Sequence, residues 1–218
     1  FSTYLTNLVH SNDIEIIKNA LILIGRIICH KISGLENFTY GFFINLLFDN
    51  RDNEQIIVLI MWILSIGLNT ETSNYMIESG IFDCITVLYH EVTTNSKIEI
   101  SLFVSDVMFY TNRQLEDYLT YDVLEIIVDT FNIGNKQAIK NMTIILTNVI
   151  DILINRYFDD TIISQDEPSI NLGLVAGFLF ENDVLNLLYN LRSSQFDDDD
   201  LIDLINRLCI SLENLTNQ

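Results

Sequence analysis

The sequence repeats itself at a spacing of about 42 residues, and this internal repeat constrains the fold more than any other feature. Phe38, Gly80 and Asp122 lie at equal intervals, since 80 − 38 and 122 − 80 both give 42. Apolar residues recur two and five positions after each of them. We therefore predict one structural unit that occurs several times along the chain.

A further copy begins at Asp183, where Asp183–Leu188 follows the same pattern as Asp122–Ile127. It lies 183 − 122 = 61 residues after the preceding copy, which is 19 more than one period. The excess falls at residues 157–171, an acidic stretch that contains the one proline of the chain, Pro168. Polar residues and proline between apolar segments are typical of loops. We predict an acidic surface loop inserted at 157–171.

Each copy is followed by a short polar break and a longer apolar segment without strand-type alternation, which predicts a helix. Small polar or acidic residues precede these segments, and Asp13, Asn53, Ser96 and the cluster Asp197–Asp200 are predicted to cap the helices. The predicted long helices run from Asp13 to Lys31, Asn53 to Leu68, Ser96 to Tyr110, Lys136 to Ile154 and Asp198 to Leu215.

A period of about 42 residues with a long apolar helix in each repeat is typical of armadillo and HEAT proteins. The predicted fold class is all-α, a right-handed armadillo/HEAT-type helical-repeat solenoid. We predict a single domain over residues 1–218 with about five partial or complete repeats. The chain begins at Phe1, and we expect it to be a piece of a longer protein.

Particular segments narrow the prediction to armadillo repeats. Glu78–Leu88 resembles the second helix of an armadillo repeat, which opens with a glycine at Gly80. Met61–Ile66 resembles the third helix of importin-α repeats, whose familiar form is Trp-Ala-Leu-Ser-Asn. Ile144–Asn148 and Ile210–Asn214 resemble the same motif with isoleucine in the tryptophan position and the asparagine kept.

The resemblance to importin-α implies a concave groove lined by the third helices, in which tryptophans form slots for Lys or Arg and asparagines hold the peptide backbone. The peptide-binding residues that it implies are Trp62, Phe103, Asn148, Asp151 and Asn214. Phe103 is the nearest aromatic residue of the intervening helix, and Asp151 follows Asn148 by one turn. For Trp62 a buried core position is the alternative, and for Asn148 a structural hydrogen bond. The expected partners are a basic nuclear-localisation peptide and importin-β.

Charge restricts the classes of partner. Eleven Lys and Arg stand against 30 Asp and Glu, which gives a formal charge of −19. Such a chain repels phosphates, so we exclude nucleic acid and anionic membranes and expect basic protein segments as partners. The apolar run Ile56–Leu68 is shorter than the roughly 18–20 residues of a membrane span and predicts a helix covered by neighbours.

The residue types that carry catalysis or hold metals do not form a recognisable pattern. Cys29, Cys84 and Cys209 lie in apolar stretches without CxxC spacing, which predicts free buried thiols in a reducing compartment. With the resemblance, this predicts the cytoplasm, the nucleus or both. The three histidines are far apart, and no phosphate-binding or nucleophile motif occurs. We therefore predict no enzyme, no metal and no cofactor.

Three functions remain open at the level of sequence. The first is an importin-α-like nuclear transport adaptor, and the second is a general armadillo scaffold for cytoskeletal, adhesion or signalling proteins. The third is a chaperone cofactor that holds a folded domain on its curved surface. An apolar groove would favour an amphipathic helix as ligand, whereas a dense acidic groove with Trp and Asn would favour Lys/Arg-rich peptides.

Overall fold

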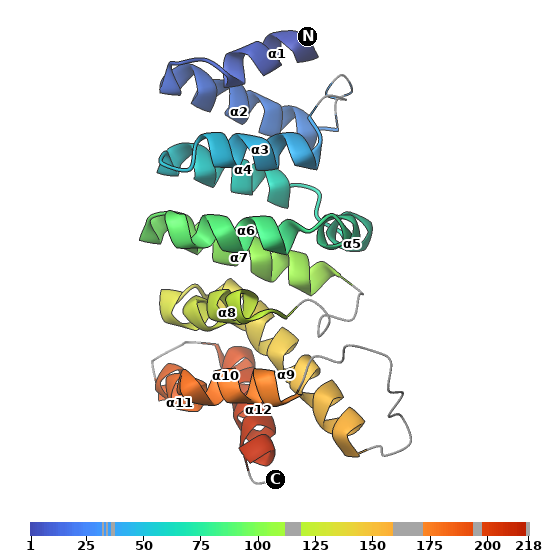
Figure 1. The fold of residues 1–218 in the computed structure, drawn as a ribbon, viewed down its shortest axis with the longest axis vertical. Helices are drawn as coiled ribbons and strands as arrows, with labels where there is room; N and C mark the ends of the chain where they lie inside the picture. The colour runs from blue at the N-terminus through green and yellow to red at the C-terminus, as the bar shows by residue number, and fades with distance from the viewer. Residues whose placement is uncertain are drawn as a thin grey trace. The chain divides into compact units, whose positions relative to one another are not determined.

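The computed structural model describes residues 1–31, 33, 35, 38–111, 119–158, 172–193 and 198–216. It divides into two units, Phe1–Asn112 and Arg113–Gln218, which are described separately below. Every regular element of the described residues is an α-helix (Figure 1). None of these helices has both the length and the apolarity needed to cross a bilayer.

The first unit contains two layers of helices. α2 (Ile14–Cys29), α4 (Glu54–Ser65) and α7 (Thr94–Tyr110) pack side by side in one layer. α1 (Ser2–Val9), α3 (Tyr40–Asp49) and α6 (Ile81–Glu91) cover them one by one, and α5 (Thr70–Glu78) packs on α6 and α7 (Figure 1). The layer of α2, α4 and α7 therefore has one face on the core and one face free of the other layer.

The second unit repeats this arrangement. α9 (Lys136–Phe158) packs beside α12 (Asp199–Thr216), while α8 (Tyr121–Ile133) covers α9 and α11 (Val184–Ser193) covers α12. α10 (Leu172–Glu181) contacts α8, α9 and α11 (Figure 1). Contact between α8 and α11 joins the two helix pairs.

The five predicted long helices are confirmed as α2, α4, α7, α9 and α12, with ends that differ by a few residues. α4 shows why an apolar run of this length is a core helix. Six of its twelve residues are at most 2% exposed, because α2, α3 and α7 surround it. The predicted acidic loop at 157–171 lies outside the described residues, apart from the last two residues of α9.

Three of the predicted helix caps are confirmed. The side chain of Asp13 accepts a hydrogen bond from the backbone N–H of Glu15, and Asn53 accepts one from Ile56. Within the acidic cluster, Asp198 accepts one from the N–H of Leu201 at 3.1 Å. Such bonds satisfy donors that a helix leaves unpaired at its first turn.

The prediction for Ser96 is wrong. α7 begins two residues earlier, at Thr94, after Thr93 in extended conformation, and Ser96 is fully buried inside the helix. Threonine and serine both suit a helix start, and packing of α7 on α4 selects the register.

Gly80 has the role expected for a glycine at the start of a second helix. Its backbone lies in the left-handed region, at φ 76°, between α5 and α6. A side chain is strained in this conformation, whereas glycine adopts it readily.

Candidate protein-binding surface

The free face of the layer formed by α2, α4 and α7 carries large apolar side chains. Leu23 on α2 is 42% exposed and Trp62 on α4 is 38% exposed. Leu102 on α7 is half-buried. We call this surface the Trp62 face, and we define it by Ile16, Asn19, Leu23, Arg26, Gln55, Leu59, Trp62, Ile66, Glu99, Leu102 and Asp106.

Helix geometry places these residues together. Along each of the three helices, and as far as Ile66 at the C-cap of α4, they recur at intervals of three or four residues, which is the spacing of one helix face. The other faces carry the buried residues that pack on α1, α3 and α6. The Trp62 face therefore lies on the side of the layer that looks away from those helices.

Trp62 is held in place by a glycine on the neighbouring helix. A Cβ atom added to Gly25 of α2 would lie 2.1 Å from Cζ3 and 2.5 Å from Cη2 of the Trp62 ring. The ring therefore lies directly on the backbone of α2, and its outer part stays exposed. The two interpretations of Trp62, core residue and surface slot, thus each describe one side of the same ring.

The role predicted for Phe103 is contradicted by its burial. Its side chain is 1% exposed, so it is part of the core and offers no surface to a peptide. The buried residues of α4 match those of α7 at an offset of 40: Ile60 with Ile100 and Ile63 with Phe103 are examples. At this offset Leu102 is the counterpart of Trp62. Sequence reasoning chose the aromatic residue, whereas the register of buried positions would have found Leu102.

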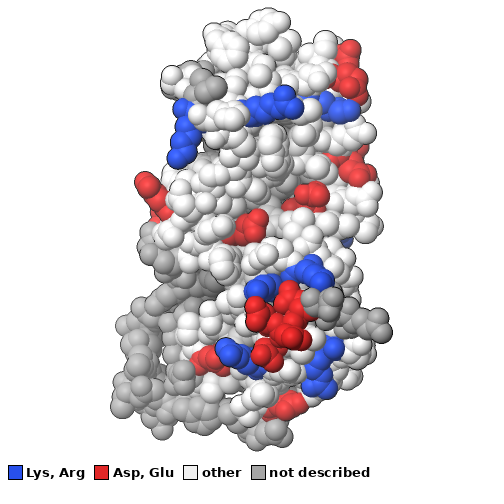
Figure 2. Space-filling view, turned by 180° about the vertical axis from the view of Figure 1, so that it is seen from behind, with Lys and Arg blue, Asp and Glu red and all other residues white. Residues whose placement is uncertain are grey.

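The charge of the Trp62 face differs from that of the chain. Arg26 is its basic residue on α2, and Glu99 and Asp106 are its acidic residues on α7. Desolvation raises the pKa of the Glu99 carboxyl above its ordinary value. Figure 2 shows uncharged surface in the N-terminal part between separate Lys and Arg and separate Asp and Glu side chains. The acidic charge of the chain is thus not concentrated here.

The second unit carries the predicted polar residues. Asn148 and Asp151 are exposed on α9, and Asn214 is exposed on α12. Asp151 accepts a hydrogen bond from the Ser211 hydroxyl at 2.9 Å, which ties α9 to α12. Ile210, one turn before Asn214, is 56% exposed. We call Asn148, Asp151, Ile210 and Asn214 the Asn face.

The three cysteines are free thiols with different environments. Cys209 is buried and Cys84 is half-buried, and desolvation raises the pKa of both thiols. Cys29 is exposed, which corrects the prediction that it is buried. It is the last residue of α2.

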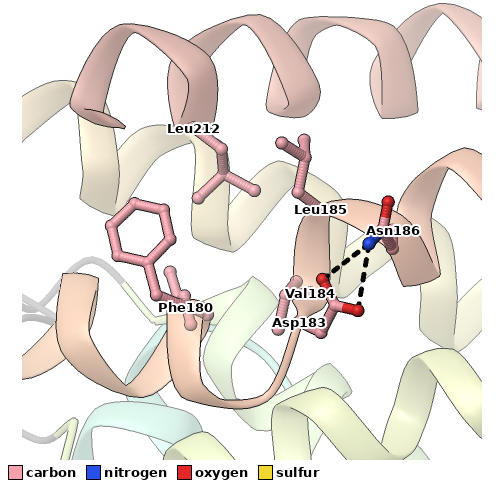
Figure 3. Close-up of a pocket in the computed structure, with 7 residues that line it drawn as sticks. Phe180, Asp183, Val184, Leu185, Asn186 and Leu212 are labelled. Atoms are coloured by element: carbon pink, nitrogen blue, oxygen red, sulfur yellow. Dashed lines mark hydrogen bonds between the residues drawn. The ribbon is translucent and has the colours of Figure 1, made fainter. Parts of the chain in front are cut away.

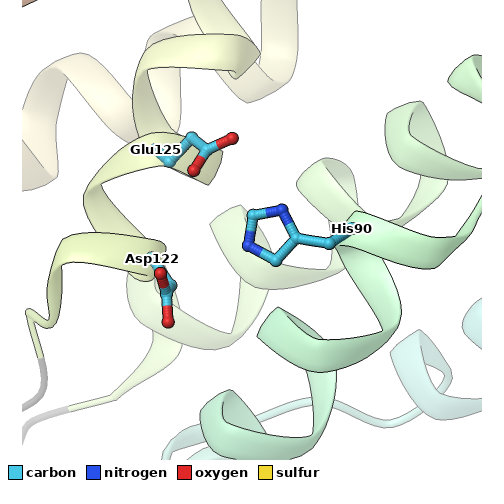
Figure 4. A group of neighbouring side chains, drawn as sticks. All are labelled: His90, Asp122 and Glu125. Atoms are coloured by element: carbon cyan, nitrogen blue, oxygen red, sulfur yellow. The ribbon is translucent and has the colours of Figure 1, made fainter.

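Within either unit, the side chains that the structure describes form no group of three that could hold a metal ion. Asp122 and Glu125 lie one turn apart at the start of α8, and His90 lies on α6 (Figure 4). His90 belongs to the first unit, whereas Asp122 and Glu125 belong to the second. The absence of a metal stays a prediction.

Comparison with solved structures identifies the fold. No protein-family model and no curated protein matches this chain. A designed armadillo repeat protein in complex with the peptide (KR)4 is similar, with a TM-score of 0.56 and 15% identity over 97% of this chain and 99% of the other. A second designed armadillo repeat protein has a TM-score of 0.51 and 14% identity over 97% and 100%. The chain therefore has the armadillo-repeat fold.

Proposed function

We propose that this protein is a non-enzymatic adaptor that binds a segment of another protein on the Trp62 face. The observation that carries the proposal is the half-exposed Trp62 ring, fixed on Gly25 and surrounded by exposed or half-exposed apolar side chains. A rigid tryptophan within an apolar patch is the typical anchor of a protein interface. The known armadillo structure with a bound peptide supports this use of the fold.

The ligand that best fits the Trp62 face is an amphipathic helix. Leu23, Trp62 and Leu102 present apolar surface on three adjacent helices, which suits a ligand with apolar residues at helical spacing. Ile66 and Asp106 stand one turn after Trp62 and Leu102, where an asparagine would be needed to hold an extended peptide backbone. This favours the general scaffold over peptide recognition through the backbone.

A selection experiment tests the proposal. A displayed library of random helical peptides is selected on the protein and counter-selected on the Trp62→Ala variant. We expect the recovered peptides to carry apolar residues three and four positions apart and to change the emission of Trp62, the one tryptophan of the chain. Val87→Ala, at an exposed apolar residue of α6, is the control. Peptides that bind Trp62→Ala as well as the unchanged protein would overturn the proposal.

The exposed Asn148 and Asn214 support a second function, nuclear import. In that case the Asn face holds a basic nuclear-localisation peptide in the cytoplasm, importin-β is a further partner, and the complex passes into the nucleus. Fluorescence anisotropy with such a peptide and a charge-matched scrambled peptide, at low and moderate salt, is the test. Binding that prefers the true motif supports import, whereas equal binding that salt removes reflects only the net negative charge.

A further inference from the structure

The charges of the Trp62 face are divided between its two outer helices. Arg26 is the basic residue that α2 contributes, whereas α7 contributes the acidic residues Glu99 and Asp106. The residues that the middle helix, α4, contributes are all uncharged. The face therefore changes from basic to acidic along the direction that runs from α2 over α4 to α7.

The charged groups nearby do not cancel this difference. On α2, Glu15 forms an ion pair with Lys18 at 2.7 Å, so Arg26 gives that helix its net charge. On α7, the ammonium group of Lys97 lies over an aromatic ring of α6, 4.4 Å from the ring centroid. Arg26 and Glu99 form no ion pair with a side chain that the structure describes. Their charges are therefore available to a partner.

Equivalent residues show that these charges lie beside the stack of repeats, where no neighbouring repeat covers them. The offset of 40 that relates α4 to α7 also relates α2 to α4, since the buried Ile24 corresponds to the buried Leu64. At this offset Arg26, Ile66 and Asp106 are counterparts, and all three are exposed or half-buried. The position of Arg26 is thus one that packing between repeats leaves at the surface.

The apolar cavity of the second unit is a different case (Figure 3). It has a volume of about 180 Å³ and lies where α10 turns into α11, next to α12. Leu185, which lines it, is the counterpart of Leu124 in the preceding copy of the repeat. Leu124 is fully buried because α10 and α11 pack on α8. The cavity therefore lies on a surface that serves for packing between repeats, and we assign no ligand to it.

The separation of α2 and α7 sets the spacing of complementary charges in a partner. Packed helices lie about 8–10 Å apart, and α4 packs on both α2 and α7, so equivalent positions on the outer helices are roughly 16–20 Å apart. An α-helix rises about 1.5 Å per residue and covers this distance in about 11–13 residues. Residues eleven positions apart point within about 20° of each other, so they share one helix face. An extended chain would cover the same distance in about five or six residues.

We propose that the helix which binds the Trp62 face carries an acidic residue over α2 and a basic residue over α7, about eleven positions apart. The acidic side chain pairs with Arg26, and the basic side chain lies beside Glu99 and Asp106. Apolar residues between them contact Trp62. Complementary charges at the two ends favour one orientation of the ligand over the reverse. The inference rests on the proposed function, because it names the charges of the same ligand.

Four stapled helical peptides with the same apolar face test the proposal. The first carries glutamate and lysine eleven positions apart, and the second carries them seven positions apart, which keeps one helix face but spans only about 10 Å. The third carries lysine at both outer positions, and the fourth carries glutamine at both. The emission of Trp62, the one tryptophan of the chain, reports binding. We expect the first peptide to bind at least about threefold more tightly than each of the others at low salt, and the differences to shrink at high salt.

Charge reversal separates this pairing from the net charge of the chain. Arg26→Glu should weaken binding of the first peptide and strengthen binding of the lysine peptide, each by at least about threefold, with unchanged circular dichroism because Arg26 is exposed. The matched control is Arg207→Glu at an exposed arginine of α12, which changes the net charge equally and should leave the order of affinities unchanged. Equal effects of the two variants would overturn the proposal.

The glutamine peptide separates the charge order from the proposed function. If it binds as tightly as the first peptide, the Trp62 face binds helices and the charge order is wrong. Tightest binding of the lysine peptide to the unchanged protein would also refute the charge order, because net charge would then decide the affinity. If none of the four peptides binds, the proposed function fails and the charge order fails with it.

Discussion

The contact between Gly25 and Trp62 leads to the sharpest prediction, which concerns Gly25→Ala. Carbon atoms in contact are normally about 3.5–4.0 Å apart, whereas the added Cβ would lie 2.1 Å from Cζ3 of Trp62. The ring must therefore move away by about 1.5 Å, or the two helices must separate. Because the outer edge of the ring is already exposed, we expect the ring to move toward solvent.

The expected change in stability is a balance of two effects. Glycine in the interior of a helix is less favourable than alanine by about 0.5–1 kcal/mol, so the substitution by itself stabilises α2. Overpacking of a well-packed contact costs about 1–3 kcal/mol. We expect Gly25→Ala to lower the free energy of unfolding by about 1 kcal/mol. The matched control is Gly177→Ala in α10, where an added Cβ meets no atom within 4 Å and the helical gain should appear alone.

Fluorescence and denaturant titration together provide the assay. Trp62 is the one tryptophan of the chain, so its emission reports on this contact alone. We expect a shift of the emission maximum to longer wavelength in Gly25→Ala and no shift in Gly177→Ala. If Gly25→Ala instead gains as much stability as Gly177→Ala with unchanged emission, the packing of Trp62 on Gly25 is wrong.

Further predictions concern single side chains. Asp151→Ala and Ser211→Ala should each lower the free energy of unfolding by about 0.5–1.5 kcal/mol, and additive losses in the double variant would argue against their hydrogen bond. Asn148→Ala should change stability by less than about 0.5 kcal/mol because the side chain is exposed, while it weakens binding of the basic peptide. A lower Tm with unchanged affinity would give Asn148 a structural role. The raised pKa of Glu99 means that its neutral form stabilises the fold at acidic pH and that this contribution is lost as pH rises through that pKa. Glu99→Gln should therefore raise Tm at neutral pH, and thermal melts at several pH values should show the advantage shrink as the solution is acidified.

Regular patterns made much of the fold predictable. The 42-residue repeat and the long apolar segments predicted the five long helices, because a helix that buries one face leaves a periodic trace in the sequence. Asp13 and Asn53 were predictable as caps, because capping is a local interaction within one helix turn. Helix periodicity and helix caps depend on residues that are close together in the sequence, so they can be predicted from the sequence alone.

The errors arose where the choice depended on contacts between helices. Thr93 and Ser96 are chemically similar starts for α7, and Phe103 and Leu102 are adjacent candidates for the exposed position. Adjacent residues on a helix point about 100° apart, so a shift of one residue exchanges a surface position for a core position.

The sequence by itself determined the helical class, the repeat and the residue types available for binding, because these follow from composition and periodicity. Tertiary structure alone decided which of those residues reach the surface. It placed the Trp62 ring on Gly25, two residues that are 62 − 25 = 37 positions apart in sequence. The physical reason is that burial is a property of the neighbours that packing brings to a side chain, and no local pattern records which neighbours those are.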